Sequence, residues 1–594
     1  MSEYHFSYKH RKTFVFLSVF LLCFCLLLSG CGLKRSKDIQ DTSSQDFQTY
    51  TEQLFLQQVC ASTITLHYTL AHPENMGITD TPVSLGHISL PENSTAPAEA
   101  ENILFALDHF SKDSLTLEQQ IDYEIMQDAL QTQIAEDTFP YYPEILSPAG
   151  GIQSELPILL AEYSFYDEQD IIDYLNLLKL VPDYFNEVIQ YETHKSQAGL
   201  FMPDYSSEVI IAQCQAMTAD LDSHFLVETF KNRLKSLSLS SEKIKEYENQ
   251  NRQLLKQKVF PAFQQLSLAL LELQGTGKNQ GGLCNYEHGK EYYSYLVYAS
   301  TGSDKSVEEF QSAVSDQRAK DLTQLQALLE KNQSLASDLQ NVQISLNTPE
   351  EMLKSLAQTI KEDFPVLNEN IKATVKNVDP SLQEYLAPAF YLTVPIDEVT
   401  NNAIYINQKS KTDQVTLFTT IAHEGYPGHL FQTVYFNNHE KNLFRHLMNY
   451  PGYIEGWATY AELYSYKYAG LPKEAAEYLQ LEQSIILSLY ASADFGIHYD
   501  GWTLKDTTQF FGAYGFSDSE TLKEIYEYIV ETPANYLKYY GGYLEFLELR
   551  DYAEKKYGDA FDISAFHEAV LKIGPAPFSI IKKYLPQYYE AARS

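Results

Sequence analysis

The chain has 594 residues and a formal net charge of −36, with 79 acidic against 43 basic side chains. This balance argues against binding of nucleic acid, which normally needs a basic face, although an acidic surface does not identify a substrate. The apolar content of 44% is enough for a large core, and the length suits one large domain or several smaller ones.

The first 30 residues have the pattern of an export signal. A basic segment over 9–12 precedes the apolar run Phe14–Leu28, which is too short for a comfortable membrane span. The run ends in Leu28-Ser29-Gly30-Cys31, which is similar to a bacterial lipobox. The similarity implies cleavage before Cys31 and a lipid on its thiol; an uncleaved anchor or an ordinary signal peptide is the alternative. We therefore expect an exported protein, anchored by lipid to the bacterial cell membrane outside the cytoplasm, with a tether over 31–45.

Three further cysteines follow the lipobox, at Cys60, Cys214 and Cys284. They are widely spaced and include no C-x-x-C pair, so the sequence predicts no cysteine metal site. At most one disulfide bond can form among them.

Apolar residues recur at three- and four-residue spacing from Phe47 onward, which predicts a mainly α-helical protein. Pro261 predicts a kink or break near Phe260. Segments rich in Pro and Gly predict loops over 73–98 and 140–157. Helices are expected within 47–70, 101–109, 115–136, 167–194, 206–237, 241–274, 292–301, 305–331 and 349–364.

The glycine-rich stretch Gly275–Lys290 is the clearest loop between the helical segments. It predicts a boundary between an N-terminal helical half (46–280) and a second half (281–594). One continuous fold is the alternative. Within the second half, Ala389–Val394 and Ala403–Asn407 are rich in β-prone residues and predict a small hairpin.

The segment after this hairpin, Val415–Gln432, reads VTLFTTIAHEGYPGHLFQ and places His423, Glu424 and His429 within seven residues. Imidazole nitrogens bind zinc well, and a glutamate beside the metal can take a proton from bound water. The segment therefore predicts a hydrolytic metal site.

The spacing of the two histidines differs from the zincin pattern H-E-x-x-H, because they are six positions apart rather than four. On a regular helix the two side chains would diverge by about 120°. Pro427 and Gly428 permit a kink that would return His429 to the face of His423. The alternative is a helix that ends at Tyr426, with His429 starting a new one.

The sequence H-E-x-x-P-G-H followed by Leu430-Phe431-Gln432 resembles the DUF885 family, a group of largely uncharacterised bacterial proteins that looks related to the gluzincin-type zinc peptidases. The resemblance extends from about Gly282 to the C-terminus. It implies a mainly α, large multi-helix zincin-like catalytic fold, with a small β-hairpin or edge sheet beside the active-site cleft. It also implies Zn2+ as cofactor, and a strand edge that pairs with a peptide substrate; a purely structural hairpin is the alternative.

A catalytic zinc site needs a third protein ligand and one open position. Twenty-five residues lie between His429 and Glu455, where the segment E-G-W-A-x-Y-A-E begins and resembles the family's. Gluzincins take their third ligand from such a helix, so the resemblance implies Glu455. Glu462 lies two turns further along the same face and is an alternative ligand or a partner of a ligand.

An oxyanion also needs a hydrogen-bond donor, and two downstream segments offer candidates by resemblance. Asp494-Phe495-Gly496-Ile497-His498 is similar to the family's D-x-G-I-H, which makes His498 a donor candidate and Asp494 its orienting partner. A satisfied structural histidine is the alternative. The segment with Tyr539-Tyr540-Gly541-Gly542 implies Tyr539 as the catalytic phenol, with Tyr540 as the alternative.

Together these features predict an exported zinc-dependent metallopeptidase in which Glu424 is the general base. Two alternatives are a zinc hydrolase of another amide or ester and a non-catalytic surface-binding lipoprotein. The sequence predicts neither the natural substrate nor the oligomeric state.

Overall fold

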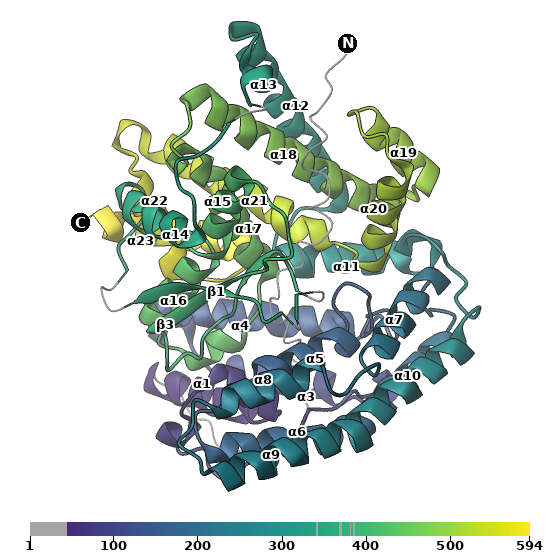
Figure 1. Ribbon diagram of the computed structural model, residues 1–594. Helices are drawn as coiled ribbons and strands as arrows, with labels where there is room; N and C mark the ends of the chain where they lie inside the picture. Colours follow the sequence, from purple (N-terminus) through teal and green to yellow (C-terminus); the bar gives the residue numbers. More distant parts are fainter. Residues whose placement is uncertain (1–43, 340–341, 368–370, 381, 384–385, 594) are drawn as a thin grey trace.

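The computed structural model describes residues 44–339, 342–367, 371–380, 382–383 and 386–593. The predicted signal peptide, Cys31 and nearly all of the tether lie outside these residues. The described chain is mainly helical with one small sheet (Figure 1), which confirms the predicted helical class. None of the helices in the described ranges is long and apolar enough to cross a membrane.

The helices up to residue 273 form the lower part of the molecule in Figure 1. They are α1 (Ser44–Val59), α2 (Thr63–Thr69), α3 (Ala96–Leu107), α4 (Leu117–Glu136), α5 (Ile152–Glu162), α6 (Glu168–Gln197), α7 (Asp204–Ala216), α8 (Phe225–Leu234), α9 (Ser241–Leu254) and α10 (Phe260–Leu273).

Three details of this region differ from expectation or refine it. The helix predicted over 206–237 is two helices, α7 and α8, because the polar stretch 218–224 makes turns instead of continuing the helix. Helix α5 begins within the predicted loop over 140–157. The break expected near Phe260 is a π-helical turn, Leu255–Val259, which places Pro261 in the first turn of α10, where a missing N–H costs little.

The second group of helices begins with α11 (Gly289–Thr301). It continues with α12 (Val307–Lys331), α13 (Leu335–Asp338), α14 (Pro349–Thr359), α15 (Gln414–Glu424), α16 (His429–His439), α17 (Pro451–Ser465), α18 (Lys473–Phe495), α19 (Leu504–Gly512), α20 (Ser519–Glu531), α21 (Asn535–Tyr557), α22 (Ile563–Ile573) and α23 (Phe578–Arg593).

The sheet has three strands in the order β1-β3-β2. The predicted hairpin is present as β2 (Ala389–Tyr391) and β3 (Asn401–Ile406), which pair antiparallel with Tyr391 opposite Ile404. Strand β1 (Lys372–Asn377) was not predicted; it pairs parallel to β3, and most of its side chains are exposed. Strand β2 is therefore an edge strand on the side that faces α15.

The boundary predicted near residue 280 does not separate the two large apolar cores. The first joins buried residues of α1, α3 and α4, such as Phe55 and Ile125, to residues of the C-terminal helices such as Trp457 and Phe566. The second holds residues 146–270 together with Phe390 of β2. The packing thus interleaves the two predicted halves, as expected for one continuous fold.

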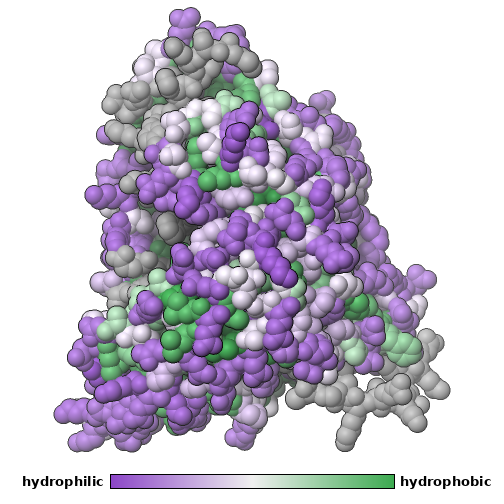
Figure 2. All heavy atoms as spheres, turned by 90° about the vertical axis from the view of Figure 1, so that its right-hand side faces the viewer, coloured by the Kyte–Doolittle hydropathy of each residue, from purple (hydrophilic) through white to green (hydrophobic). Residues whose placement is uncertain are grey.

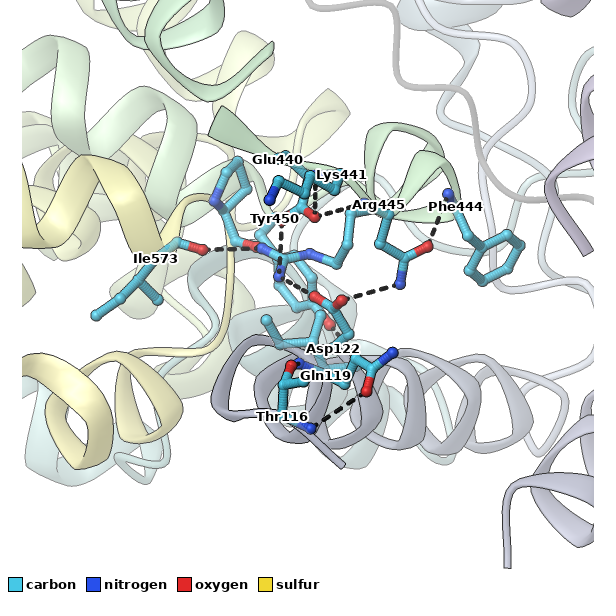
Figure 3. Close-up of polar contacts among 12 residues, drawn as sticks. Thr116, Gln119, Asp122, Glu440, Lys441, Phe444, Arg445, Tyr450 and Ile573 are labelled. Carbon is cyan, nitrogen blue, oxygen red and sulfur yellow. Dashed lines mark hydrogen bonds and ion pairs between the residues drawn. The ribbon is translucent and has the colours of Figure 1, made fainter. Parts of the chain in front are cut away.

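A buried ion-pair network also joins the ends of the chain (Figure 3). Arg445, 2% exposed, donates to the Asp122 carboxylate of α4 at 2.9 Å and to the carbonyls of Ile573 and Pro575 at 3.0 and 2.9 Å. Glu440 lies 3.6 Å from the same guanidinium. Burial raises the pKa of Asp122 to about 6, although Arg445 acts to lower it.

The surface is mostly polar. Figure 2 shows the face that carries α7, α10 and α20, where hydrophilic side chains dominate and apolar ones gather in a patch in the lower part of the view. Exposed apolar side chains of α7 and α10 include Val209 and Leu268.

Candidate metal centre

The H-E-x-x-P-G-H segment forms the end of one helix and the start of the next. Helix α15 ends at Glu424, residues 425–428 form a short loop, and α16 begins at His429. A Cβ at Gly428 would lie 1.8 Å from the carbonyl oxygen of His423, so only glycine allows the loop to turn back against α15. The loop is held by hydrogen bonds from Gly428 N to Ala422 O and from Trp457 Nε1 to Pro427 O, both 2.9 Å.

This turn brings together side chains that one straight helix would separate. The rings of His423 and His429 lie 4.8 Å apart between centroids. Glu455, in the second turn of α17, lies with Oε2 3.7 Å from His423 Nε2 and 3.4 Å from His429 Nε2. The structure has the alternative arrangement, in which a new helix begins at His429. The two imidazoles still lie next to each other.

The burial and spacing of these three side chains suit a metal ion, independently of the sequence motif. They are buried, and one ligand atom from each lies within 4.8 Å of the other two. His423 Nε2, His429 Nε2 and both carboxylate oxygens of Glu455 have no hydrogen-bond partner among the described residues. Buried polar atoms without partners are costly. Because tetrahedral zinc ligands lie about 3.4 Å apart, a His2Glu set of this size suits zinc.

Glu462 supports the cluster from the outer side. Its Oε2 lies 3.0 Å from His423 Nδ1, which leaves Nε2 directed at the shared point. Burial lowers the pKa of His423, but the carboxylates of Glu455 and Glu462 outweigh it and raise the pKa to about 10. Burial also raises the pKa of Glu455, but the two imidazoles outweigh it and hold the pKa far below its usual range.

Glu424 lies beside the cluster but has a different partner. It is 1% exposed, and its Oε2 accepts a hydrogen bond of 2.9 Å from the backbone N–H of Tyr391 in β2. Burial raises the pKa of Glu424, while His423 and His429 act to lower it. The edge strand thus orients the carboxylate predicted to act as general base, a contact that sequence alone did not indicate.

Tyr539 reaches the site from α21 because α21 packs very closely on α17. A Cβ at Gly456 would lie 2.5 Å from the backbone of Gly542, so glycines allow the two helices to touch. Tyr539, 5% exposed, lies against the His423 ring with centroids 6.5 Å apart. Burial, Glu455 and Glu424 all raise its pKa well above the usual value, so the phenol stays protonated. Tyr540 points elsewhere, 3.3 Å from Ser484 Oγ.

His498 does not join this cluster, and we do not retain it as an oxyanion donor. Its Nδ1 lies 3.2 Å from the backbone N–H of Leu283, and its Nε2 lies 2.7 Å from the carbonyl of Ile529. Both ring nitrogens are therefore used by the backbone. Asp494 does not orient His498 either: its carboxylate accepts from Tyr293 OH at 2.5 Å and from Ala534 N at 3.0 Å, which fixes the start of α21.

A cavity of about 780 Å3 adjoins the metal centre. His429 and Gln432 of α16 lie in its wall, as do Tyr391 and Thr393 of the β2 segment. Another part of the wall comes from the N-terminal region, including Glu136 at the end of α4 and Glu155 of α5. The sequence did not reveal this wall, because it depends on contacts between segments hundreds of residues apart.

Cys60, Cys214 and Cys284 are free thiols.

Comparison with known proteins extends over nearly the whole fold. The family model described as "Bacterial protein of unknown function (DUF885)" matches residues 74–585. A crystal structure of a candidate lipoprotein from Colwellia psychrerythraea is similar with a TM-score of 0.80 and 19% identity, over 93% of this chain and 100% of that one. A candidate lipoprotein of unknown function from Shewanella oneidensis is similar with a TM-score of 0.63 and 15% identity, over 91% of this chain and 99% of that one. No curated protein matches the sequence.

Proposed function

The chain belongs to the DUF885 family of bacterial proteins of unknown function, and from its site we propose that it is a zinc-dependent metallopeptidase. The observation that carries this proposal is the convergence of His423, His429 and Glu455. Four of their polar atoms are buried without a hydrogen-bond partner among the described residues, next to Glu424, and His429 lies in the wall of a large cavity.

His423, His429 and Glu455 would hold the zinc ion. When bound, zinc supplies a water molecule of lowered pKa and a Lewis acid for a carbonyl oxygen. Glu424 accepts a proton from the attacking water on its carboxylate and delivers it to the nitrogen of the leaving amine. Burial raises the pKa of Glu424, which favours proton uptake by its carboxylate. The protonated Tyr539 phenol donates a hydrogen bond to the oxygen on which negative charge develops.

The cavity supports a peptide as the substrate. Gln432 Oε1 and Asn437 Nδ2, both from residues in its wall, have no hydrogen-bond partner among the described residues. One is an acceptor and the other a donor, as a peptide backbone requires. Thr393 and Val394, which follow edge strand β2, line the same cavity and would pair with an extended chain.

We place the protein outside the cytoplasm, held to the membrane by lipid at Cys31. The lipobox-like sequence supports this location, as do the two similar structures, which are described as candidate lipoproteins. A tether after Cys31 would leave the cavity accessible to extracellular or periplasmic peptides.

Metal content tests the first part of the proposal. We expect about one zinc per chain in the wild type and loss of it in His429→Ala, because two ligands do not hold the ion tightly. His446→Ala is a matched control, since His446 lines the cavity but lies outside the ligand set. Absence of zinc from the wild type after incubation with excess zinc would overturn the proposal.

Peptide cleavage tests the second part. Glu424→Gln keeps the shape of the side chain but cannot take a proton, so kcat should fall by about 10²–10⁴-fold while zinc stays bound. Zinc-loaded wild type that cleaves esters or other amides, but no peptide in a mixed library, would favour the hydrolase alternative. Zinc-loaded wild type without any hydrolysis would favour a binding lipoprotein.

A further inference from the structure

The cavity beside the metal centre is lined by acidic groups with few cations to balance them. Its carboxylates are Glu136, Asp137, Glu144 and Glu155. Of these, only Glu144 has an ion-pair partner among the described residues, Lys195 at 2.9 Å. The permanent cation among the lining residues is Arg445, which is already held by Asp122, Glu440 and two backbone carbonyls. The wall therefore favours positive charge in the lumen.

Helix α4 adds to this potential. It ends at Glu136, Asp137 caps it, and no basic side chain stands in its last turn. The C-terminal end of a helix carries partial negative charge, so acidic side chains there are unfavourable in the protein alone. Burial raises the pKa of Glu136, and Asp137 raises it further. A bound cation would relieve this repulsion.

Glu155 is an acidic residue of the cavity that shares a neighbouring charge with the metal site. It stands in the first turn of α5, and the charge of Lys538 on α21 acts both on it and on the metal ligand Glu455. Within the part of the chain that the structure describes, the Glu155 carboxylate forms no ion pair and accepts no hydrogen bond. Burial raises its pKa to about 7, and the charge of Lys538 offsets only part of this effect.

A second wall residue points to the same kind of ligand. Gln432 follows His429 by one turn on α16, so both side chains are on one helical face. It is 3% exposed, and its side-chain oxygen lacks a donor among the described residues. Glu155 and Gln432 together present acceptors without donors, which an ammonium or guanidinium group would satisfy. Aromatic rings in the wall, including Tyr68 and Tyr141, suit a cation as well.

We infer that the cavity selects peptides that carry a positively charged amine or guanidinium group, and that Glu155 is the specificity-determining residue that binds this charge. The inference rests on the proposed peptidase function for its meaning, but binding can be measured without catalysis. The cation could be the N-terminal amine of the peptide or a Lys or Arg side chain; both offer the same donors.

The test uses full-length protein in detergent that carries Glu424→Gln, so that peptides bind without being cleaved. Four pentapeptides of one alanine-based sequence differ only in a free or acetylated N-terminus and in one lysine or norleucine. Calorimetry should show that at least one cationic peptide binds about tenfold more tightly than the neutral one. Adding Glu155→Gln should abolish that difference and leave binding of the neutral peptide unchanged.

A matched control is Glu242→Gln, the same change of charge on an exposed residue of α9 away from the cavity. It should keep the full preference. Preference for the free amine over its acetylated form would identify the N-terminus as the source of charge, and preference for lysine over norleucine would identify a side chain. Equal binding of all four peptides, binding of none, or a preference that survives Glu155→Gln would overturn the inference.

This outcome is separable from the proposed function. A protein that holds no zinc and cleaves nothing refutes the peptidase, yet its charge preference can still be read. A protein that cleaves neutral and cationic peptides with equal KM, and shows equal KM in Glu155→Gln, supports the peptidase and refutes the preference.

Discussion

The Arg445 network and the histidine cluster, two of the buried groups of charged side chains in the described residues, differ in how completely their atoms are hydrogen-bonded. In the Arg445 network, guanidinium, carboxylates and carbonyls satisfy one another, and only Arg445 Nε lacks a partner among the described residues. In the histidine cluster, four atoms of His423, His429 and Glu455 lack one. A paired network holds helices together, whereas a convergent set of unpaired atoms is suited to a ligand.

The largest effect is expected from breaking the paired network. Arg445→Met should lower the free energy of unfolding by about 3–5 kcal/mol, because Asp122 is left buried without its cation. Urea unfolding measures the change. Replacing both partners, in Asp122→Asn with Arg445→Met, should recover part of the loss. Arg252→Met, which removes an exposed ion pair with Asp222, is the control and should cost less than about 1 kcal/mol. Equal losses at the buried and exposed sites would contradict the contrast.

Zinc should complete the unpaired cluster. At a free concentration of 100 times Kd, zinc should stabilise the wild type by about 2.7 kcal/mol, since it binds only the folded chain. Thermal unfolding with zinc and then with a chelator measures this shift. Glu455→Gln should show no shift, because a carboxylate ligand is lost. A wild type that responds no more than this variant would place the cluster with the structural networks.

The pH dependence of zinc binding sharpens the comparison further. The neighbouring carboxylates raise the pKa of His423 to about 10, so its imidazole is protonated at neutral pH. Zinc requires the neutral ring, and binding must therefore release a proton. Zinc affinity should rise about tenfold per pH unit between pH 7 and 8. Calorimetry in buffers of different ionisation enthalpy should detect the released proton; no release would contradict the ligand role of His423.

The smallest effect is expected at Glu462, which contacts a ligand rather than the metal. Glu462→Gln should weaken zinc binding by about tenfold, since the glutamate orients His423 through Nδ1. Competition with a zinc-binding dye measures this affinity, with Glu242→Gln as the control for charge. Complete loss of zinc would instead make Glu462 a direct ligand.

The sequence predicted most clearly those parts of the site whose residues lie close together in the chain. His423, Glu424 and His429 are adjacent, and Glu455 opens a recognisable segment, so the candidate ligand set could be named in advance. The wall with Glu136 and Glu155 could not be, because it depends on how α4 and α5 pack on distant helices. Strand β1 does alternate, since Ala373 and Val375 are partly buried between exposed neighbours, but it is short and mostly polar, and it pairs only with the distant strand β3. The role considered for His498 rested on a motif alone. In the structure, both ring nitrogens of His498 contact backbone groups instead, the N–H of Leu283 and the carbonyl of Ile529.

The interleaving of the first core has a consequence for the order of folding. Helix α4 emerges from the ribosome early, but its partners come at the end: Lys583 of α23 contacts Glu124 of α4 at 2.6 Å across 459 positions of sequence. Loop closure over such a length is slow and must precede the contacts that reward it. The cavity wall at the end of α4 therefore cannot reach its folded arrangement until α23 has been synthesised. The cavity would therefore remain incomplete until synthesis of the chain has ended.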